Sequence, residues 1–205
     1  GSVGASGDLA PLGHMALVLI GEGEVFFEGK RLKTVSALKK AKVKPLSLKP
    51  KEGLSLINGT QASTAIAIKT LLDGKNLLLS ADIAGAVSVE NSFSSRKVFQ
   101  KRIHDLKQHP GQRTSAKNIY KLLNKSEIVH SHNNCSKIQD PYSFRCIPHV
   151  HGASRDMFSN AVNIVNNEIN SVSDNPLVFN ENLIVSSGHF HAEHIAQALD
   201  IISIA

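Results

Sequence analysis

The stretch from Leu54 to about Phe93 constrains the fold most, because it is long, mostly apolar and rich in Ala, Leu, Ile and Ser. Its apolar residues cover most of the helical circumference rather than one stripe, which predicts a helix buried between other helices. We expect a break in this helix near Asp73-Gly74, where a helix-weakening glycine follows a polar residue. The sequence therefore predicts a core made of long packed helices.

The rest of the chain predicts further helices, a short strand with a turn, and a small β-hairpin. We expect the strand and turn over residues 24–30, and the hairpin where Asn180-Glu181-Asn182 joins residues 177–179 to residues 183–185. His109-Pro110-Gly111 is expected to be a turn, and residues 124–136 a polar loop. Helices are expected over residues 9–20, 35–41, 94–106, 115–123, 150–171 and 191–205. The predicted fold class is mainly α with small β-hairpin insertions.

Composition excludes several classes of function. Hydrophobic residues make up 41% and charged residues 20% of the chain, as in an ordinary globular protein. Aromatic residues make up only 5%, with no Trp, so stacking surfaces for bases are not expected. The net charge of +6 comes largely from a basic segment, Lys30, Arg31, Lys33, Lys39, Lys40, Lys42, Lys44, Lys49 and Lys51. Pro45 and Pro50 interrupt this segment, which favours a solvated surface over a nucleic-acid-binding arm.

Cysteine content and hydropathy indicate the cellular compartment of the protein. Cys135 and Cys146 form no disulfide framework, which favours a reducing compartment, and we expect a cytoplasmic protein. No apolar run reaches the roughly 18 residues that a membrane helix needs, so no membrane partner is expected. The chain opens inside a glycine-rich run and closes on an apolar one, so we expect a fragment truncated at both ends.

The loop Gly4-Ala5-Ser6-Gly7-Asp8 carries the sharpest local signal. A glycine-rich loop before a helix is usually a turn or a phosphate cradle, but no G-x-x-x-x-G-K-[ST] motif is present. A third interpretation is backbone cyclisation. The Gly7 nitrogen would attack the Ala5 carbonyl carbon, and loss of two waters would leave Ser6 with an exocyclic methylene. Glycine suits the attacking position, because such a tight backbone excludes larger side chains.

Four ordered blocks give this loop a context. They are residues 1–12, then Lys49-Pro50-Lys51-Glu52-Gly53-Leu54 with Ile57-Asn58-Gly59-Thr60-Gln61, then residues 139–146, and finally Asp174-Asn175-Pro176 through Phe190-His191-Ala192-Glu193. Together they resemble the histidine and aromatic amino-acid ammonia-lyase family along the whole chain. The resemblance implies the long-helix bundle core of the fumarase/aspartase-like fold. It implies one partial domain, residues 1–205, with a cofactor loop at 1–8, a peripheral basic insertion at 24–52 and a helical core at 54–205.

The resemblance also implies a cofactor and an activity. Ala5, Ser6 and Gly7 would form 4-methylideneimidazole-5-one (MIO) autocatalytically, and no metal or nucleotide is expected. The electrophilic ring would take up the substrate's amino group, and ammonia would leave to give an α,β-unsaturated acid. For L-histidine the product would be urocanate.

Five further residues match functional positions of the family, and four of them have a structural alternative. Arg145 would hold the substrate carboxylate, a task that suits its planar fork, or it is a surface cation. Tyr142 would aid proton transfer or orientation, or it packs in the core. Asn58 would bond to the ring or substrate, or it caps a helix. Gln139 would be a pocket amide or lies on a surface loop. Glu193 would accept an imidazole N–H, which favours histidine over tyrosine or phenylalanine.

The chain also departs from the family pattern. His149 stands where Gln is expected, His189 where Asn is expected, and Gly13 where Ala or Ser is usual. The family's catalytic Tyr and a substrate-contacting His lie in an N-terminal portion that this sequence does not include. The family builds each site from several subunits of a homotetramer, so the fragment alone is expected to be inactive.

Three alternatives stay open. The first is a tyrosine or phenylalanine ammonia-lyase, or an aminomutase, on the same cofactor. The second is a metal-dependent enzyme that uses the cluster His189, His191 and His194 beside Glu193, although no H-E-x-x-H motif occurs. The third is a structural remnant without catalysis.

Overall fold

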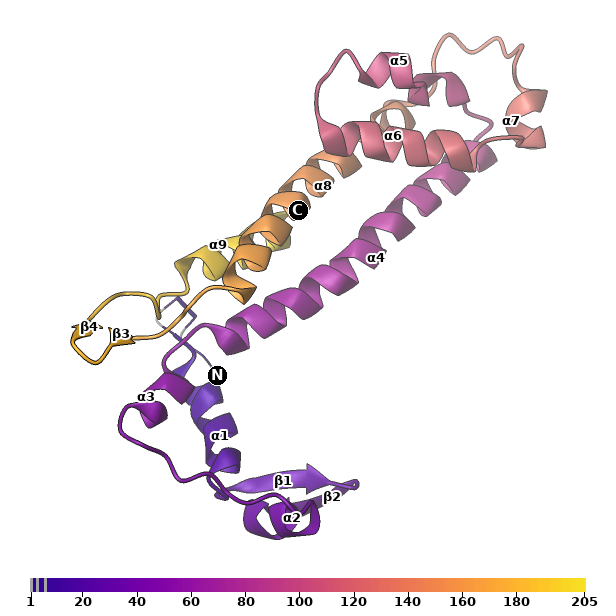
Figure 1. Ribbon diagram of the computed structural model, residues 1–205. Helices are drawn as coiled ribbons and strands as arrows, with labels where there is room; N and C mark the ends of the chain where they lie inside the picture. The colour runs from indigo at the N-terminus through magenta and orange to yellow at the C-terminus, as the bar shows by residue number, and fades with distance from the viewer. Residues whose placement is uncertain (1, 3, 6) are drawn as a thin grey trace. The chain divides into compact units, whose positions relative to one another are not determined.

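The computed structural model describes residues 2, 4, 5 and 7–205 of the chain (Figure 1). The chain forms two compact units. Unit 1 combines residues 1–68 with residues 164–199, and unit 2 combines residues 69–163 with residues 200–205. Three helices, α4 (Gln61–Asn91), α8 (Tyr142–Ile169) and α9 (Glu193–Ile204), contribute residues to both units.

Unit 1 contains the N-terminal elements and the C-terminal hairpin. Within it, α1 packs against α3, and α2 packs against the hairpin of β1 and β2 (Figure 1). The β1–β2 turn places Glu28 at φ 49° and Gly29 at φ 74°, and such left-handed residue pairs form the tight hairpin turn that matches strand twist. The remaining bounds are α1 (Leu9–Leu19), β1 (Glu24–Phe27), β2 (Lys30–Lys33), α2 (Thr34–Lys40), α3 (Glu52–Ile57), β3 (Leu177–Asn180) and β4 (Leu183–Val185).

Unit 2 gathers short helices around an apolar core. Its elements besides parts of α4 and α8 are η1 (Arg96–Phe99), α5 (Lys101–His104), α6 (Pro110–Leu122) and α7 (Glu127–Ser131). The core consists of Ala86, Val89, Phe99, Ile119, Leu123 and Val129. Ser126 caps α7 by accepting a hydrogen bond from the Val129 N–H at 3.1 Å, which satisfies one of the free donors of the first turn.

A buried carboxylate ties α4, α6 and α8 together in unit 2. Asp82 is 1% exposed, and its oxygens accept hydrogen bonds from Ser115 (2.6 Å), Asn118 (2.8 Å) and Arg155 (2.6 Å). The His151 ring lies 3.0 Å away. Burial raises the pKa of Asp82, but the hydrogen bonds from Ser115, Asn118 and His151 and the charge of Arg155 outweigh it and hold the pKa below its usual value.

The structure confirms the predicted fold class, which is mainly α with small β-hairpins, and the predicted hairpin of β3 and β4 is present. The strand and turn expected at residues 24–30 form a hairpin too, because β2 pairs with β1. The predicted break near Asp73-Gly74 is wrong, because α4 runs unbroken from Gln61 to Asn91. Gly74 lies where a Cβ would press on the Phe158 ring, so this glycine allows close packing rather than ending the helix. The interruption falls earlier, between α3 and α4 at residues 58–60.

Two prolines also behave differently from the prediction. Pro110 begins α6 instead of forming a turn, because the first helical position needs no N–H donor. α8 begins at Tyr142 rather than near residue 150 and contains Pro148.

The bounds of two further segments differ from the prediction. Residues 124–136 are not wholly loop, since they include α7, and residues 94–106 hold only η1 and α5. No helix in the described part of the chain is long and apolar enough to span a membrane.

Candidate functional site

Asp8 anchors the glycine-rich loop in unit 1 to the start of α4. Asp8 is completely buried, and its carboxylate accepts hydrogen bonds from the Ser63 N–H (2.6 Å), the Ser63 hydroxyl (2.5 Å) and the Ser2 hydroxyl (2.6 Å). The Asp8 N–H donates to the Gly59 carbonyl at 2.9 Å. An acidic group at this helix start is favourable, because the free N–H groups of the first turn carry partial positive charge.

The described atoms of the tripeptide Ala5-Ser6-Gly7 lie between this anchor and the start of α9. Gly7 has φ +95°, a left-handed conformation that L side chains rarely adopt, and its N–H donates to the Gly4 carbonyl at 3.2 Å. The Ala5 carbonyl accepts a hydrogen bond from the Ala192 N–H at 2.9 Å. Ser6 lies outside the described residues.

Asn58 lies beside the same loop. A Cβ built on Gly7 would lie 3.8 Å from the Asn58 amide oxygen, and the Asn58 N–H donates to the Leu54 carbonyl at the end of α3. Glu193 is the first residue of α9 and is exposed. Its carboxylate accepts a hydrogen bond from Gln197 at 3.0 Å. Ala5, Gly7, Asn58 and Glu193 thus all belong to unit 1.

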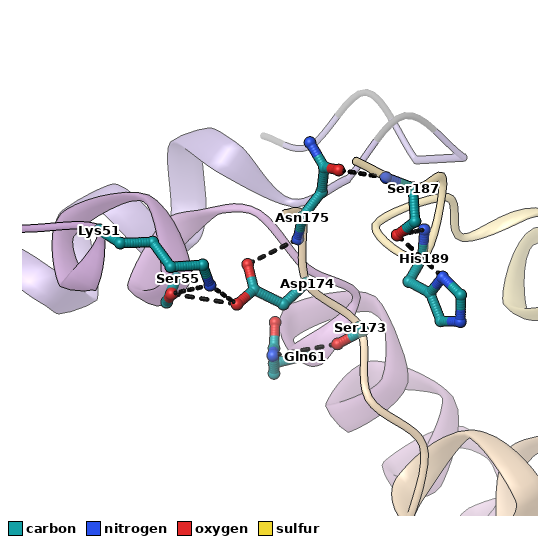
Figure 2. Close-up of polar contacts among 8 residues, drawn as sticks. All are labelled: Lys51, Ser55, Gln61, Ser173, Asp174, Asn175, Ser187 and His189. Carbon is teal, nitrogen blue, oxygen red and sulfur yellow. Dashed lines mark hydrogen bonds and ion pairs between the residues drawn. The ribbon is translucent and has the colours of Figure 1, made fainter. Parts of the chain in front are cut away.

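A chain of polar contacts fixes the segment that leads to α9 (Figure 2). Lys51 and Asp174 form an ion pair that Ser55 joins, and the Asn175 N–H donates to Asp174 at 2.7 Å. The Asn175 side-chain oxygen accepts hydrogen bonds from the Ser187 N–H at 2.6 Å and the Ser186 hydroxyl at 3.3 Å.

The charge of Asp174 is favoured within this chain of contacts. Burial raises the pKa of Asp174, but hydrogen bonds from Lys51, the Asn175 backbone and Ser55, with the Lys51 charge, keep it below its usual value. Asp174 therefore stays ionised at neutral pH, and its contacts hold the base of the β3–β4 hairpin to α3.

The other predicted site residues lie in unit 2, at the start of α8. Gln139 and Arg145 line a pocket of about 290 Å³, and Tyr142 is 76% exposed. The Arg145 Nε donates to the Asp140 carbonyl at 2.9 Å, and the Asp140 carboxylate accepts from the Ser95 N–H at 2.7 Å. Within the described residues no hydrogen bond engages the terminal guanidinium nitrogens of Arg145, which leaves a fork for a carboxylate.

Two of the three departures from the family pattern, His189 and His149, lie in different units. The His189 Nδ1 lies 3.0 Å from the Ser187 hydroxyl in unit 1, and the His149 ring lies 5.7 Å from that of His104 in unit 2. Partial burial lowers the pKa of His149, and the neighbouring His104 and Lys107 lower it further. His149 is therefore expected to be neutral at pH 7.

The metal alternative gains no support from the geometry. Among residues 2, 4, 5 and 7–205, no group of three or more His, Cys, Asp and Glu side chains could hold a metal ion. The His191 Nδ1 instead accepts a hydrogen bond from the Glu193 N–H at 3.3 Å, and the Glu193 carboxylate bonds along its own helix.

Sequence reasoning missed the residues that hold the loop in place, Asp8, Ser63, Asn175 and Ala192. Asp8 stands directly before α1 and reads as the cap of that helix, yet its side chain makes no cap bond there. It serves α4 instead, which lies about 55 residues further on. Ala192 holds the loop through its backbone N–H alone, so the identity of its side chain does not reveal this role in the sequence. The sequence marks Asp174-Asn175-Pro176 only as a turn within a family motif and gives no sign that it supports the loop.

Comparisons place the chain among known proteins. The family model described as aromatic amino acid lyase matches residues 1–205. A histidine ammonia-lyase from Myxococcus xanthus (strain DK1622) is 50% identical over 206 residues, which cover 100% of this chain and 41% of that protein. The chain therefore spans less than half the length of this relative.

Two solved structures are similar over nearly the whole chain. Histidine ammonia-lyase from Trypanosoma cruzi gives a TM-score of 0.86 at 36% identity, covering 98% of this chain and 38% of that one. Tyrosine aminomutase from Streptomyces globisporus gives a TM-score of 0.86 at 33% identity, covering 98% of this chain and 42% of that one.

Proposed function

The chain belongs to the aromatic amino acid lyase family, and from this premise we propose that the full-length protein is a histidine ammonia-lyase that converts L-histidine to urocanate and ammonia. One observation carries the proposal. The tripeptide Ala5-Ser6-Gly7 lies on a loop whose Gly7 has φ +95° and whose Ala5 carbonyl is fixed by a hydrogen bond. Such a backbone fits the MIO group, because ring closure needs a tightly turned chain without a side chain at the attacking nitrogen.

The candidate site residues each have a distinct part in this chemistry. When formed, the MIO group supplies an electrophile for the substrate's amino group. Arg145 binds the substrate carboxylate through its fork, and Gln139 in the same pocket wall hydrogen-bonds to the substrate. Tyr142 orients the substrate and assists proton transfer. The Asn58 amide lies close to Gly7 and would hydrogen-bond to the ring or the substrate. Arg145 thus holds the substrate by its carboxylate, and the substrate's amino group is presented to the electrophile.

The relatives support histidine as the substrate. The protein from Myxococcus xanthus that is 50% identical is named a histidine ammonia-lyase, whereas the tyrosine aminomutase is 33% identical. We propose further that Glu193 accepts an N–H from the imidazole. Substituting Glu193→Gln should then raise KM for histidine, while the protein should still lose the two waters that mark ring formation. Unchanged histidine kinetics would show that Glu193 does not bind the substrate and only bonds to Gln197.

A tyrosine-specific enzyme or aminomutase is the second candidate, because a tyrosine aminomutase has the same TM-score, 0.86, as the histidine enzyme. The two candidates differ in product. Full-length protein given histidine, tyrosine or phenylalanine should form the absorbance of urocanate with histidine only. Formation of a cinnamate-type product or a β-amino acid instead would overturn the assignment to histidine.

Intact mass tests the cofactor independently of substrate. The full-length protein should be lighter than its sequence by two waters, and Ser6→Ala should abolish this loss and lower kcat by orders of magnitude. Ser36→Ala, an exposed serine of α2, is the control and should leave both quantities unchanged. A wild-type mass equal to that of the unmodified sequence would overturn the proposed function and favour a structural remnant.

A further inference from the structure

The hydrogen bond from the Ala192 N–H to the Ala5 carbonyl oxygen acts on the carbon that the cyclisation attacks. The two atoms are 2.9 Å apart, and Ala192 is 2% exposed. In acyl chemistry, backbone N–H groups at 2.7–3.1 Å from a developing oxyanion stabilise it, and a buried donor acts more strongly because water does not compete.

The donor also lies at the start of a helix. Ala192 directly precedes α9, and its own carbonyl accepts the Ala196 N–H at 2.9 Å, so the helix begins there. The N-terminal peptide groups of a helix carry partial positive charge, which favours negative charge on an oxygen that they face. The geometry therefore combines a direct donor with a favourable local field at the Ala5 carbonyl.

Resting on the proposed function, we propose that the Ala192 N–H is the oxyanion donor for MIO formation. The Gly7 nitrogen bonds to the Ala5 carbonyl carbon, the carbonyl electron pair moves to oxygen, and that oxygen takes the Gly7 amide proton. The resulting hydroxyl leaves with the Ser6 N–H proton as the first water, giving a C=N bond. The Ser6 hydroxyl leaves with its Cα proton as the second water. No oxidant or co-reactant is required.

Asn175 is the positioning residue for this donor. Its side-chain oxygen accepts from the Ser187 N–H at 2.6 Å (Figure 2). The His191 N–H donates to the Gly188 carbonyl at 2.9 Å, which closes the turn before Ala192. Asn175 is itself held through Asp174 to Lys51 and Ser55. The loop that carries the donor is therefore fixed to α3 rather than free.

An amide-to-ester exchange tests the donor alone. Lactic acid incorporated at position 192 of the full-length protein keeps the methyl side chain and replaces the N–H by oxygen. The rate at which newly made protein loses two waters, followed by intact mass and by absorbance of the ring, should fall by about 10²–10³-fold. The matched control is the same exchange at Ala196, whose N–H donates to Ala192 within the helix. It should cyclise within a few-fold of the wild-type rate.

The outcomes separate this inference from the proposed function. Equal cyclisation rates for the two esters would overturn the inference and leave the proposed function intact. A wild-type protein that never loses water would overturn the proposed function, and the inference with it. Circular dichroism before each measurement shows whether the Ala192 ester is folded. If it is not folded, variants of Asn175 test the same donor.

A side-chain series gives a second measurement that does not depend on the ester. Asn175→Ala removes the acceptor for Ser187 and should slow cyclisation, whereas Asn175→Asp keeps an oxygen there and should restore most of the rate. Asn180→Ala is the control, because the Asn180 oxygen accepts the Asn182 N–H at 2.9 Å at the other end of the same hairpin. Cyclisation at the wild-type rate in Asn175→Ala would overturn the positioning role.

Discussion

Two buried carboxylates show how single residues stabilise this chain. Asp8 is surrounded by neutral donors, whereas Asp82 also faces the guanidinium of Arg155. A buried charge is costly unless hydrogen bonds and an opposite charge compensate it, and Asp82 has both. The two sites therefore respond differently to removal of charge, and Asp82 is the more sensitive because its loss leaves Arg155 unpaired.

Replacing Asp82 by Asn should destabilise the protein strongly. Breaking a buried ion pair by removing one partner costs about 3–5 kcal/mol. The control is Asp73→Asn on the same helix, where Lys69 and Asp73 form an exposed pair that should change stability by about 0.5 kcal/mol or less. Denaturant unfolding of the full-length proteins measures both changes, and equal effects would contradict the assigned role of Asp82.

Asp82 should also make stability depend on acid pH. Its pKa in the folded state is lower than in the unfolded chain, so the folded state binds fewer protons. The stabilisation is complete above the unfolded pKa of about 3.9 and is lost as pH falls through the folded pKa. The free energy of unfolding should therefore drop as pH falls below about 4, and the drop should be smaller in Asp82→Asn. Parallel curves would refute this account.

At the scale of elements, periodicity and turn residues predicted most helices, the β3–β4 hairpin and strand β1, but not their bounds and not strand β2. Proline and glycine misled most, because their effect depends on what lies next to them. Pro110 begins a helix, and Gly74 admits the Phe158 ring. No pattern within one segment reveals such a neighbour. The same holds for the site, where family motifs marked side chains such as Arg145 but not the backbone donor of Ala192.

Gly152 offers a test of close packing between α6 and α8. A Cβ built on Gly152 would collide with the backbone of Gln112, so Gly152→Ala should destabilise the protein by about 1–3 kcal/mol. Gly13→Ala in α1 is the control, because its Cβ would meet nothing within 4 Å. It should stabilise the helix by about 0.5–1 kcal/mol. Thermal unfolding compares them, and stabilisation by both would show that α6 and α8 are not in close contact.

At the scale of the whole molecule, the chain is two compact units that share three helices. Ala5, Gly7, Asn58 and Glu193 belong to unit 1, whereas Gln139, Tyr142 and Arg145 belong to unit 2. The family resemblance implies a homotetramer with shared active sites. In such an assembly the two groups of residues need not come from the same subunit.

Complementation between inactive variants tests shared sites. Full-length Ser6→Ala and Arg145→Ala should each be inactive alone, and coexpression should restore part of the activity if one site draws on two subunits. Light scattering should give the mass of a tetramer for every sample. Coexpressed tetramers without activity would place both residues of a site on one subunit.

Unit 1 is assembled from two stretches of sequence, residues 1–68 and 164–199, with most of unit 2 between them. A ribosome adds about 5–20 residues per second, so residue 192 follows residue 5 by roughly 10–40 seconds. During that interval the Ala5 carbonyl waits without the N–H of Ala192. Because the proposed oxyanion donor is synthesised late, we expect ring formation to follow synthesis of the β3–β4 hairpin, and a nascent chain that stops before this hairpin should lose the two waters about 10²–10³-fold more slowly.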